Sequence, residues 1–324
     1  MILVRAPLRI SLFGGGSDFK NFYKKKKSAV LSFSFNKYVY VIVKKSFSNN
    51  FVISYSKKET TKNIEKIKHP IIRETLKFFK IKEPLEIISI SDIPGKGSGL
   101  GASSAFACAL VKAIAKYKRM RLAKSSIAKI ASIIEISKCN SKIGKQDHYA
   151  SAIGGFNLLR FYSSEKVKIK KIKVKKIFFQ NLFLVPTNIY RNASKILTKQ
   201  QLRKNIKNRN LQIDKLVKMA IGVSKIFQKN SISSLNQIGL FMHKGWIIKK
   251  KISESITNKK IDNLYNLGIK AGSTGGKLLG AGGGGFILFY VPKEKQNYFK
   301  KRFSNSFYIR PKLDIQGLLV KKLK

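Results

Sequence analysis

The sequence predicts a mixed fold of strands and helices in two parts, and three observations support this prediction. The chain has 324 residues, a length that suits two domains or one large one at about 150 residues per domain. Residues up to about position 92 are rich in aromatic and β-branched side chains, which are typical of strands. From about residue 180 onward a long, mostly helical stretch dominates. We therefore expect an N-terminal domain over 1–180 and a C-terminal domain over 181–324.

The first part alternates between strand-like and helix-like segments around one glycine-rich segment. Strands are expected at 31–43, 51–56 and 85–91. The glycine-rich segment IPGKGSGLGASS (93–104) opens directly into a helix with a face of small residues. Further along we expect a second helix over 122–138, then a loop with the sequence GKQDHYA and a strand with the sequence GGFNLLRF.

The second part begins with a short strand, LFLVP (182–186), which leads into the helical stretch 192–267. A second glycine-rich segment, GSTGGKLLGAGGGG (272–285), then runs into the strand FILFYV (286–291). The sequence contains no tandem repeat and no low-complexity linker between these segments.

The chain carries a very large positive charge, because 67 lysine and arginine residues face only 15 aspartate and glutamate residues, giving a net charge of +52. Such a charge favours polyanionic partners, including nucleic acids and phosphorylated small molecules. The basic residues are spread along the whole chain, and most are lysine rather than the arginine used to read bases. The densest stretch, KVKIKKIKVKK (166–176), predicts a strand with one lysine face in solvent. We therefore expect no nucleic-acid partner, although the charge would attract ATP.

The composition also argues against several other classes of protein. Two cysteines give no disulfide framework, and three histidines far apart in the chain give no zinc-binding spacing. No apolar run reaches the roughly 18 residues that a transmembrane helix needs, and the first residues lack the apolar core of a signal peptide. These features predict a cytoplasmic protein without a membrane partner, either a monomer or a homodimer.

The first glycine-rich segment has the position and composition of a phosphate-binding loop. Glycines between a strand and a helix let the free amides at the start of the helix approach a phosphate. A Walker A loop is excluded because the chain lacks GxxxxGK[ST]. A dinucleotide-binding loop is disfavoured because it needs an acidic residue about 20 residues after the glycines to bind ribose. The sequence there is KYKRMRLAK, and the next acidic residue is Glu135. Two interpretations stay open: a glycine-rich turn without a ligand, and a non-Walker kinase loop in which Ser103 and Ser104 offer hydroxyls to Mg²⁺ and phosphate.

Three carboxylates stand out because the chain has so few of them. Asp18 follows three glycines, Glu135 lies in an apolar helical segment, and Asp147 lies in GKQDHYA. Magnesium needs hard oxygen ligands, and removing a proton from a hydroxyl needs a positioned carboxylate. The three residues are candidates for a substrate anchor, a metal ligand and a base, although each taken alone is more typical of a helix cap or a solvated charge.

Taken together, three segments resemble the motifs of the GHMP kinases, the family named for galacto-, homoserine, mevalonate and phosphomevalonate kinases. RAPLRISLFGGGSDF (5–19) resembles the first motif, PGKGSGLGASSAF (94–106) resembles the second, which binds ATP, and KLLGAGGGGFILFY (277–290) resembles the third. Within the family, the pattern over 143–157 and the pattern H-x-x-W-x-x-K-K (243–250) are most similar to the heptose 7-phosphate kinases, which are related to the kinase part of bacterial fucokinases.

The resemblance implies a two-domain α+β fold. The N-terminal domain would be similar to ribosomal protein S5 domain 2, the C-terminal domain would be ferredoxin-like, and the active site would lie in the cleft between them. It also implies ATP and Mg²⁺ as cofactors, with Mg²⁺ held by Ser103 and Glu135. The ATP phosphates would be bound by the segment Gly97, Ser98, Gly99, Leu100, Gly101, Ala102, Ser103 and Ser104.

By the same resemblance, Asp147 would take the proton from a sugar hydroxyl or orient it, and Arg9 would stabilise charge nearby. The residues expected to bind the acceptor are Asp18, Gly16, Ser17, Gly283 and Gly284. If the acceptor carries its own phosphate, Arg191 at a strand-to-helix junction could bind it, and Lys249 and Lys250 are further candidates.

The activity implied is a sugar 1-kinase that converts D-glycero-D-manno-heptose 7-phosphate to the 1,7-bisphosphate for nucleotide-activated heptose synthesis. One alternative is a related kinase of an unphosphorylated sugar such as fucose. Another alternative, from a different class, is a nucleic-acid-binding protein built on a degenerate kinase fold.

The sequence departs from the family pattern in three places. An additional residue between Pro94 and Gly99 either shifts the loop or places Lys96 beside the phosphates. Ala102 stands where these kinases often have serine, which leaves Ser103 as the magnesium candidate. His148 replaces the glutamine usual after the catalytic aspartate, with either a mechanistic or a packing role. His243 and Trp246, one helical turn apart, could likewise contact the sugar or pack in the core.

Overall fold

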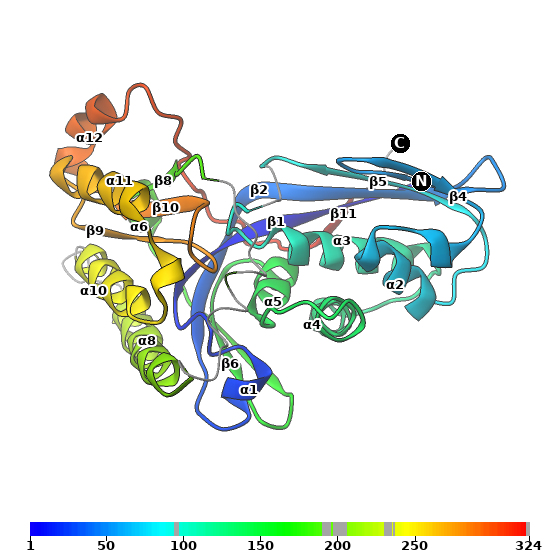
Figure 1. Ribbon diagram of the computed structural model, residues 1–324, viewed down its shortest axis with the longest axis horizontal. Coiled ribbons are helices and arrows are strands. Elements are labelled where there is room, and N and C mark those ends of the chain that lie inside the picture. The colour runs from blue at the N-terminus through cyan, green and yellow to red at the C-terminus, as the bar shows by residue number, and fades with distance from the viewer. Residues whose placement is uncertain (94–96, 190–195, 197–205, 230–234, 236, 322–324) are drawn as a thin grey trace.

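The computed structural model describes residues 1–93, 97–189, 196, 206–229, 235 and 237–321. In this part of the chain the structure is mixed α and β, as predicted. A large sheet and a small sheet lie side by side, each with its own helices (Figure 1). None of the described helices is both long enough and apolar enough to cross a membrane.

The large sheet has eight strands within the described residues, in the order β11-β1-β2-β5-β3-β4, with β6 joined to β2 and β7 to β6. Their bounds are β1 (Ile2–Phe13), β2 (Val30–Lys45), β3 (Phe51–Ser54), β4 (Lys58–Thr61), β5 (Leu85–Ser91), β6 (Phe156–Phe161), β7 (Val167–Lys171) and β11 (Leu319–Lys321). β1 and β2 are antiparallel, and the long β2 pairs with β6 through its first residues and with β5 through its last. This pairing confirms the strands predicted at 31–43, 51–56 and 85–91.

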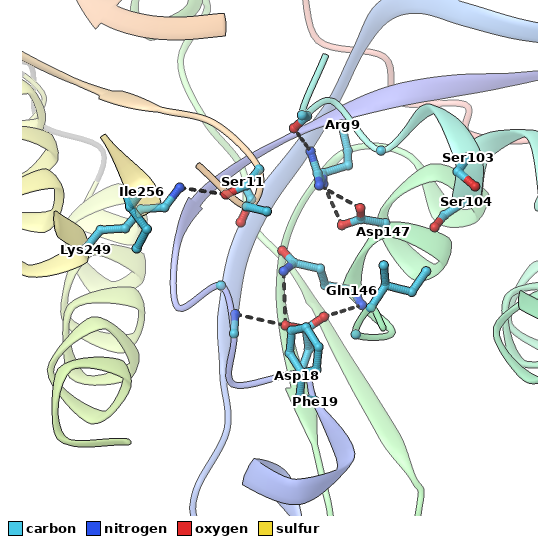
Figure 2. Close-up of a pocket in the computed structure, with 18 of the residues that line it drawn as sticks. Arg9, Ser11, Asp18, Phe19, Ser103, Ser104, Gln146, Asp147, Lys249 and Ile256 are labelled. Carbon is cyan, nitrogen blue, oxygen red and sulfur yellow. Dashed lines mark hydrogen bonds and ion pairs between the residues drawn. The ribbon is translucent and has the colours of Figure 1, made fainter. Parts of the chain in front are cut away.

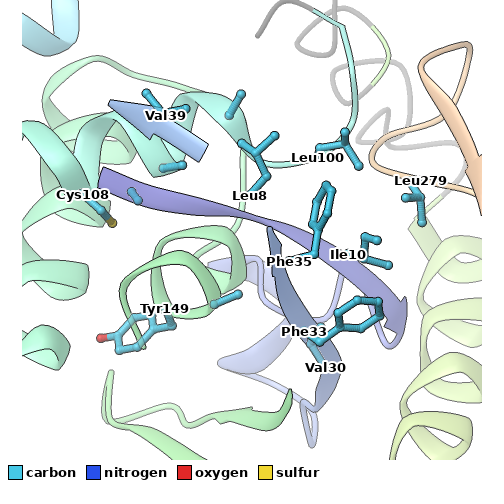
Figure 3. Close-up of a cluster of buried hydrophobic side chains, with 14 of the residues drawn as sticks. Leu8, Ile10, Val30, Phe33, Phe35, Val39, Leu100, Cys108, Tyr149 and Leu279 are labelled. Atoms are coloured by element: carbon cyan, nitrogen blue, oxygen red, sulfur yellow. The ribbon is translucent and has the colours of Figure 1, made fainter. Parts of the chain in front are cut away.

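Helices gather on one side of the large sheet: α2 (Pro70–Phe78), α3 (Ala102–Tyr117), α4 (Lys124–Ser132) and α5 (Gln146–Ile153) (Figure 1). Small side chains such as Ala105 and Ala109 are fully buried in α3, which lets this helix pack closely on β1 and β2. Close to this contact, Leu8 and Ile10 of β1 lie near Phe33 and Phe35 of β2 in the core (Figure 3). The core thus holds the start of α3, and with it the first glycine-rich segment, against β1.

The small sheet is antiparallel with the order β8-β10-β9 among the described residues. Its strands are β8 (Leu182–Pro186), β9 (Gly275–Leu278) and β10 (Phe286–Tyr290), so the strands predicted at 182–186 and 286–291 are confirmed. The helices of this part are α6 (Lys176–Gln180), α8 (Ile206–Lys229), α10 (Ile238–Lys250), α11 (Lys259–Lys270) and α12 (Gln296–Arg302). α10 packs on β9 and on α8, and α8 also contacts β1 and β2, which joins the two parts.

Two predicted elements differ from the structure. The helix expected over 122–138 is α-helical only in α4, and its last turn, Ile133–Lys138, is a π-helix. The strand expected over 166–176 ends with β7, after which the chain turns into α6. The short elements are α1 (Lys20–Tyr23) and the 3₁₀ turns η1 (Ile64–Lys66), η4 (Glu254–Ile256) and η5 (Lys293–Lys295).

The C-terminal segment returns from the small sheet to the large one. β11 pairs antiparallel with β1, with Leu319 opposite Arg5. Before this strand, Asp314 accepts a hydrogen bond from the Tyr38 hydroxyl at 3.0 Å, and its backbone bonds to Ser34 and Gly155. Residues near the C-terminus therefore belong to the large sheet by hydrogen bonding, while the boundary near residue 180 stays a prediction.

Candidate active site

A pocket lined by residues from both parts of the chain contains most of the predicted site residues (Figure 2). Its walls come from β1 and the glycine loop after it, the start of α3, the π-helical turn and the start of α5. The other wall comes from α8, the end of α10 and the segment from Lys277 to Ala281. Segments far apart in sequence therefore meet at one place.

The first glycine-rich segment leads into α3 at the edge of the pocket. Gly97, Gly99 and Gly101 have φ angles of 80°, 75° and 77°, a left-handed conformation that glycine adopts without strain. This winding loop is held to β1, because the backbone amide of Arg9 donates to the carbonyl of Leu100 at 3.0 Å. The free amides of the first turn of α3 lie beside the pocket, which is the arrangement of a phosphate-binding helix start.

Arg9 and Asp147 form a two-point ion pair next to this loop. Arg9 Nε donates to Asp147 Oδ1 at 2.7 Å and Arg9 Nη2 donates to Asp147 Oδ2 at 2.6 Å. The third nitrogen, Nη1, donates to the carbonyl of Gly99 at 2.7 Å. A bidentate pair fixes the orientation of both groups. The predicted base and the predicted loop are thus connected through a single guanidinium.

Glu135 lies in the π-helical turn, buried behind the first turn of α3. Its carboxylate accepts hydrogen bonds from the hydroxyls of Ser103 and, at 2.9 Å, Ser104, and its Oε2 lies 2.7 Å from His148 Nε2. Burial raises the pKa of Glu135, but the contacts with His148 and the two serines outweigh burial, so the net shift is downward. The carboxylate is therefore ionised, and with Ser103 it offers hard oxygens of the kind that Mg²⁺ prefers.

No group of three or more acidic, histidine or cysteine side chains among the described residues is arranged to hold a metal ion by itself. Glu135 and Ser103 are only two oxygen donors, whereas Mg²⁺ in phosphoryl-transfer sites takes several of its ligands from phosphates and water. The pair therefore fits a magnesium ion that is shared with a nucleotide.

Asp18 lies on the other side of Asp147 from the serines of α3 (Figure 2). Its carboxylate accepts from the backbone amides of Gly16 and Gln146, at 3.1 and 3.0 Å, and from the Gln146 side-chain amide at 3.1 Å. Burial, reinforced by the charge of Asp147, raises the pKa of Asp18 from 3.8 to about 6 despite these hydrogen bonds. Gly144 makes this approach possible, because a Cβ atom there would lie 2.0 Å from Asp18 Oδ2.

Lys277 is a buried cation in the pocket wall that the sequence analysis did not single out. It lies on β9, donates to the carbonyl of Leu12 and sits over the Phe13 ring with Nζ 5.8 Å from the ring centre. Burial, together with the charge of Arg9, lowers the pKa of Lys277 from 10.5 to about 7. The small sheet therefore contributes a group to the site whose charge is sensitive to its surroundings.

Some predicted residues lie outside the pocket lining. Ser17 is buried and donates to the carbonyl of Gly14 at 2.7 Å, Leu100 is in the core, and Gly283 and Gly284 pack against Ile256 and Ile189. The pocket is lined instead by the neighbouring residues Gly280 and Ala281. Arg191 and Lys96 lie outside the described residues.

Of the candidate residues predicted over 243–250, only Lys249 lines the pocket. Lys249 lines the pocket and donates to the carbonyls of Leu278 and Gly280 at 2.8 and 2.7 Å. Lys250 instead pairs with Asp262 at 3.4 Å. His243 contacts the hydroxyl of Tyr265, and Trp246 is fully buried, so both pack in the C-terminal core.

Besides Lys277, the sequence analysis missed Gln146 and Arg209 as lining residues. Gln146 precedes the predicted base, which is a local signal for a site residue. Arginine is rare in this chain, with 11 arginines against 56 lysines, so an arginine such as Arg209 is a better candidate for a specific role than any one lysine. Neither signal shows which segment a side chain will contact.

Comparisons with known proteins show the family to which the chain belongs. The family model for the GHMP kinases N terminal domain matches residues 64–155. The D-glycero-alpha-D-manno-heptose 7-phosphate kinase of Campylobacter jejuni is 31% identical over 95% of both chains. The chain therefore belongs to the GHMP kinases, and it is a phosphotransferase that uses an alcohol group as acceptor.

Solved structures show the same fold. A crystal structure described as a D-glycero-D-manno-heptose 1-phosphate kinase from Bacteroides thetaiotaomicron matches with a TM-score of 0.80 and 22% identity, covering 100% of both chains. Lactococcus lactis galactokinase, solved with galactose, matches with a TM-score of 0.75 and 13% identity, covering 98% of this chain and 94% of that one. The predicted α+β fold of the GHMP kinases is thus confirmed.

Proposed function

We propose that the protein transfers the γ-phosphoryl group of ATP to the anomeric hydroxyl of D-glycero-D-manno-heptose 7-phosphate, giving the 1,7-bisphosphate. The single observation that carries the chemistry is the ion pair between Arg9 and Asp147 at the mouth of the glycine-rich loop. The choice of sugar is supported by the name of the Campylobacter relative, which aligns along nearly all of both chains. We place the reaction in the cytoplasm, as a step toward nucleotide-activated heptose.

ATP would bind with its phosphates at the loop from Gly97 to Ser104. The left-handed glycines bring the backbone close to the phosphates, and the amides at the start of α3 face the negative charge. Lys277 adds a positive charge in the same pocket when it is protonated. Because these groups are fixed before ATP arrives, little reorganisation is needed at the moment of transfer.

Asp147 is the group that would accept the proton of the attacking hydroxyl. The anomeric oxygen forms a bond to the γ-phosphorus, the bond between that phosphorus and the bridging oxygen of ADP breaks, and the hydroxyl proton passes to an oxygen of Asp147. Arg9 holds both oxygens of this carboxylate and therefore sets its direction. Asp18, held by Gln146, would accept hydrogen bonds from other hydroxyls of the sugar.

Ser103 and Glu135 would hold Mg²⁺ together with the phosphates. The ion would neutralise charge on the β- and γ-phosphates during transfer. His148 acts through Glu135: its Nε2 contact helps to fix the buried carboxylate. This assigns His148, the departure from the family pattern, a positioning role.

The experiment is a coupled ADP-release assay with a panel of acceptors: heptose 7-phosphate, free heptose, fucose, galactose and mannose. We expect turnover with heptose 7-phosphate, and we expect Asp147→Asn to lower kcat by about 10²-fold or more while ATP binding is unchanged. The matched control is Asp262→Asn, which removes a carboxylate paired with Lys250 outside the pocket. If only a free sugar is turned over, heptose 7-phosphate is not the substrate. If Asp147→Asn turns over at the wild-type rate, Asp147 does not accept the proton.

A further inference from the structure

Arg209 lies in the wall of the pocket at the start of α8. Only 4% of its surface is exposed. Ile213 and Leu216, four and seven residues further along the helix, also line the pocket. They lie on the same helical face as Arg209. The side chain of Ile213 reaches the glycine loop after β1, since a Cβ atom on Gly16 would lie 3.1 Å from Ile213 Cδ1. This face of α8 is therefore packed against the acceptor end of the pocket.

The guanidinium of Arg209 has no anionic partner among the described residues. Its Nη2 reaches Asn21 Oδ1 at 3.5 Å, the limit of a hydrogen bond, and its buried Nε has no partner. Burial lowers the pKa of Arg209, and no neighbouring charge contributes to the shift. Arginine nevertheless stays protonated in proteins. Arg209 is therefore a buried positive charge that no described residue compensates, which is unfavourable in a ligand-free protein.

The other arginine of this pocket shows the contrast. Arg9 is equally buried, but its guanidinium donates hydrogen bonds to Asp147 and to the carbonyl of Gly99. Asp18 and Asp147, both in the same pocket, form no ion pair with Arg209 and bind other donors instead. Neither acid of the pocket therefore neutralises Arg209, and its buried Nε has no hydrogen-bond acceptor among the described residues.

The place of Arg209 along the pocket indicates which group it would bind. Its one hydrogen bond within the described residues is to Asn21 of α1, the helix that directly follows Asp18 and Phe19. Asp18 and Phe19 lie at the end of the pocket away from Ser103 and Ser104 (Figure 2). A sugar whose reactive hydroxyl meets Asp147 and whose other hydroxyls meet Asp18 would extend toward Arg209 with its far end.

We propose that Arg209 binds a phosphate group on the acceptor, at the end remote from the hydroxyl that is phosphorylated, and so selects a sugar phosphomonoester over the free sugar. The proposal rests on the proposed function for the identity of the sugar, but the phosphate site itself is argued from Arg209. Guanidinium and phosphate match in a bidentate geometry, which gives a strong and directional contact. Bound phosphate would also supply the negative charge that Arg209 lacks.

The test is calorimetric binding of D-glycero-D-manno-heptose 7-phosphate, free heptose and inorganic phosphate, without ATP, to the wild-type protein and three variants. We expect Arg209→Met to weaken binding of heptose 7-phosphate by about 10²-fold and to leave binding of free heptose unchanged. Arg209→Lys, which keeps the charge but loses the fork, should fall between the two. Lys215→Met removes one charge from the exposed face of the same helix and should change nothing, which controls for the general field of the lysines.

A second readout does not depend on any sugar. Because Arg209 is an uncompensated buried charge, Arg209→Met should unfold at a higher temperature than the wild-type protein when no ligand is present. Inorganic phosphate should stabilise the wild-type protein and not this variant. Equal stabilisation of the wild-type protein and of Arg209→Met by inorganic phosphate, or stabilisation of neither, would overturn the proposal.

The remaining outcomes separate this proposal from the proposed function. Equal affinity of the wild-type protein for the sugar with and without phosphate, or an equal loss of both in Arg209→Met, overturns the phosphate site while the kinase activity stands. Binding of heptose 7-phosphate that depends on Arg209, without phosphoryl transfer from ATP, keeps the phosphate site and removes the kinase assignment. If Arg209→Met does not fold, Arg209→Lys is the variant that decides. Weaker binding of heptose 7-phosphate alone supports the phosphate site, and equally weakened binding of free heptose overturns it.

Discussion

At the scale of single residues, the buried carboxyl group of Asp18 makes the stability of the folded protein depend on pH. Its pKa is about 6 in the folded protein against 3.8 in its usual state. Between these values the folded protein holds a proton that the unfolded chain has lost, so raising the pH weakens the fold there. The stabilisation from protonated Asp18 is complete below about pH 4 and is lost as the pH rises through about 6. Above that pH the carboxylate is ionised, which is the form that the proposed contact with sugar hydroxyls requires.

This predicts a pH-dependent difference between the wild-type protein and Asp18→Asn. Since asparagine does not titrate, the free energy of unfolding of the wild-type protein relative to the variant should fall by about 2 kcal/mol from pH 4 to pH 7. Urea unfolding at a series of pH values measures this difference. A constant difference over the range would mean that Asp18 titrates normally in the folded protein.

At the scale of elements, three consecutive residues at the start of α5 hold three different parts of the site. Gln146 binds Asp18, Asp147 binds Arg9, and His148 contacts Glu135. Successive residues of a helix point about 100° apart, so one helical turn reaches in three directions. A shift of α5 relative to β1 would therefore alter all three contacts together.

Ser151 anchors α5 to β1, and its removal tests the importance of this contact. Its hydroxyl donates to the carbonyl of Pro7 at 2.7 Å, and the residue is fully buried. Ser151→Ala should lower the free energy of unfolding by about 1 kcal/mol, because one buried hydrogen bond is lost, and should raise KM more than it lowers kcat. Urea unfolding and steady-state kinetics measure both effects. The matched control is Ser126→Ala, on the exposed surface of α4.

The sequence could predict those parts of the site that depend on local patterns. The glycine loop, Asp147, Asp18 and Glu135 lie in short motifs, and the structure brings all of them to one pocket. The π-helical turn around Glu135 was missed because its composition is that of an ordinary apolar helix. Arg209 and Lys277 were missed because their environment is created by packing between distant segments, and lysine is so abundant that one more is not informative.

At the scale of the whole molecule, the excess of lysine is distributed over both parts of the chain. Most carboxylates that are not in the pocket pair with lysines near the surface, such as Glu86 with Lys44 at 2.8 Å. The remaining positive charges repel one another and weaken the folded state, while they draw polyanions toward the protein. The excess of lysine does not come from the described pocket, whose basic lining residues are Arg9, Arg209, Lys249 and Lys277.

The C-terminal segment contributes to the stability of the large sheet. Deletion of residues 312–324 would remove β11 and the contacts of Asp314 with Tyr38, Ser34 and Gly155, and would expose the hydrogen-bonding edge of β1. We expect a lower unfolding temperature and association through the free edge, measured by calorimetry and by light scattering. Deletion of 322–324 alone is the control, and a monomeric truncated protein with unchanged unfolding temperature would contradict the prediction.

The pairing of Leu319 with Arg5 also has a consequence for how the protein is made. A ribosome releases β1 long before it releases β11, so the first strand must wait with one edge unprotected while nearly all of the chain is synthesised. Arg9 belongs to the same strand, so its ion pair with Asp147 forms on a sheet that is complete only after β11 has been synthesised. A chaperone that shields β1 in the meantime would keep this unpaired edge from associating with other chains.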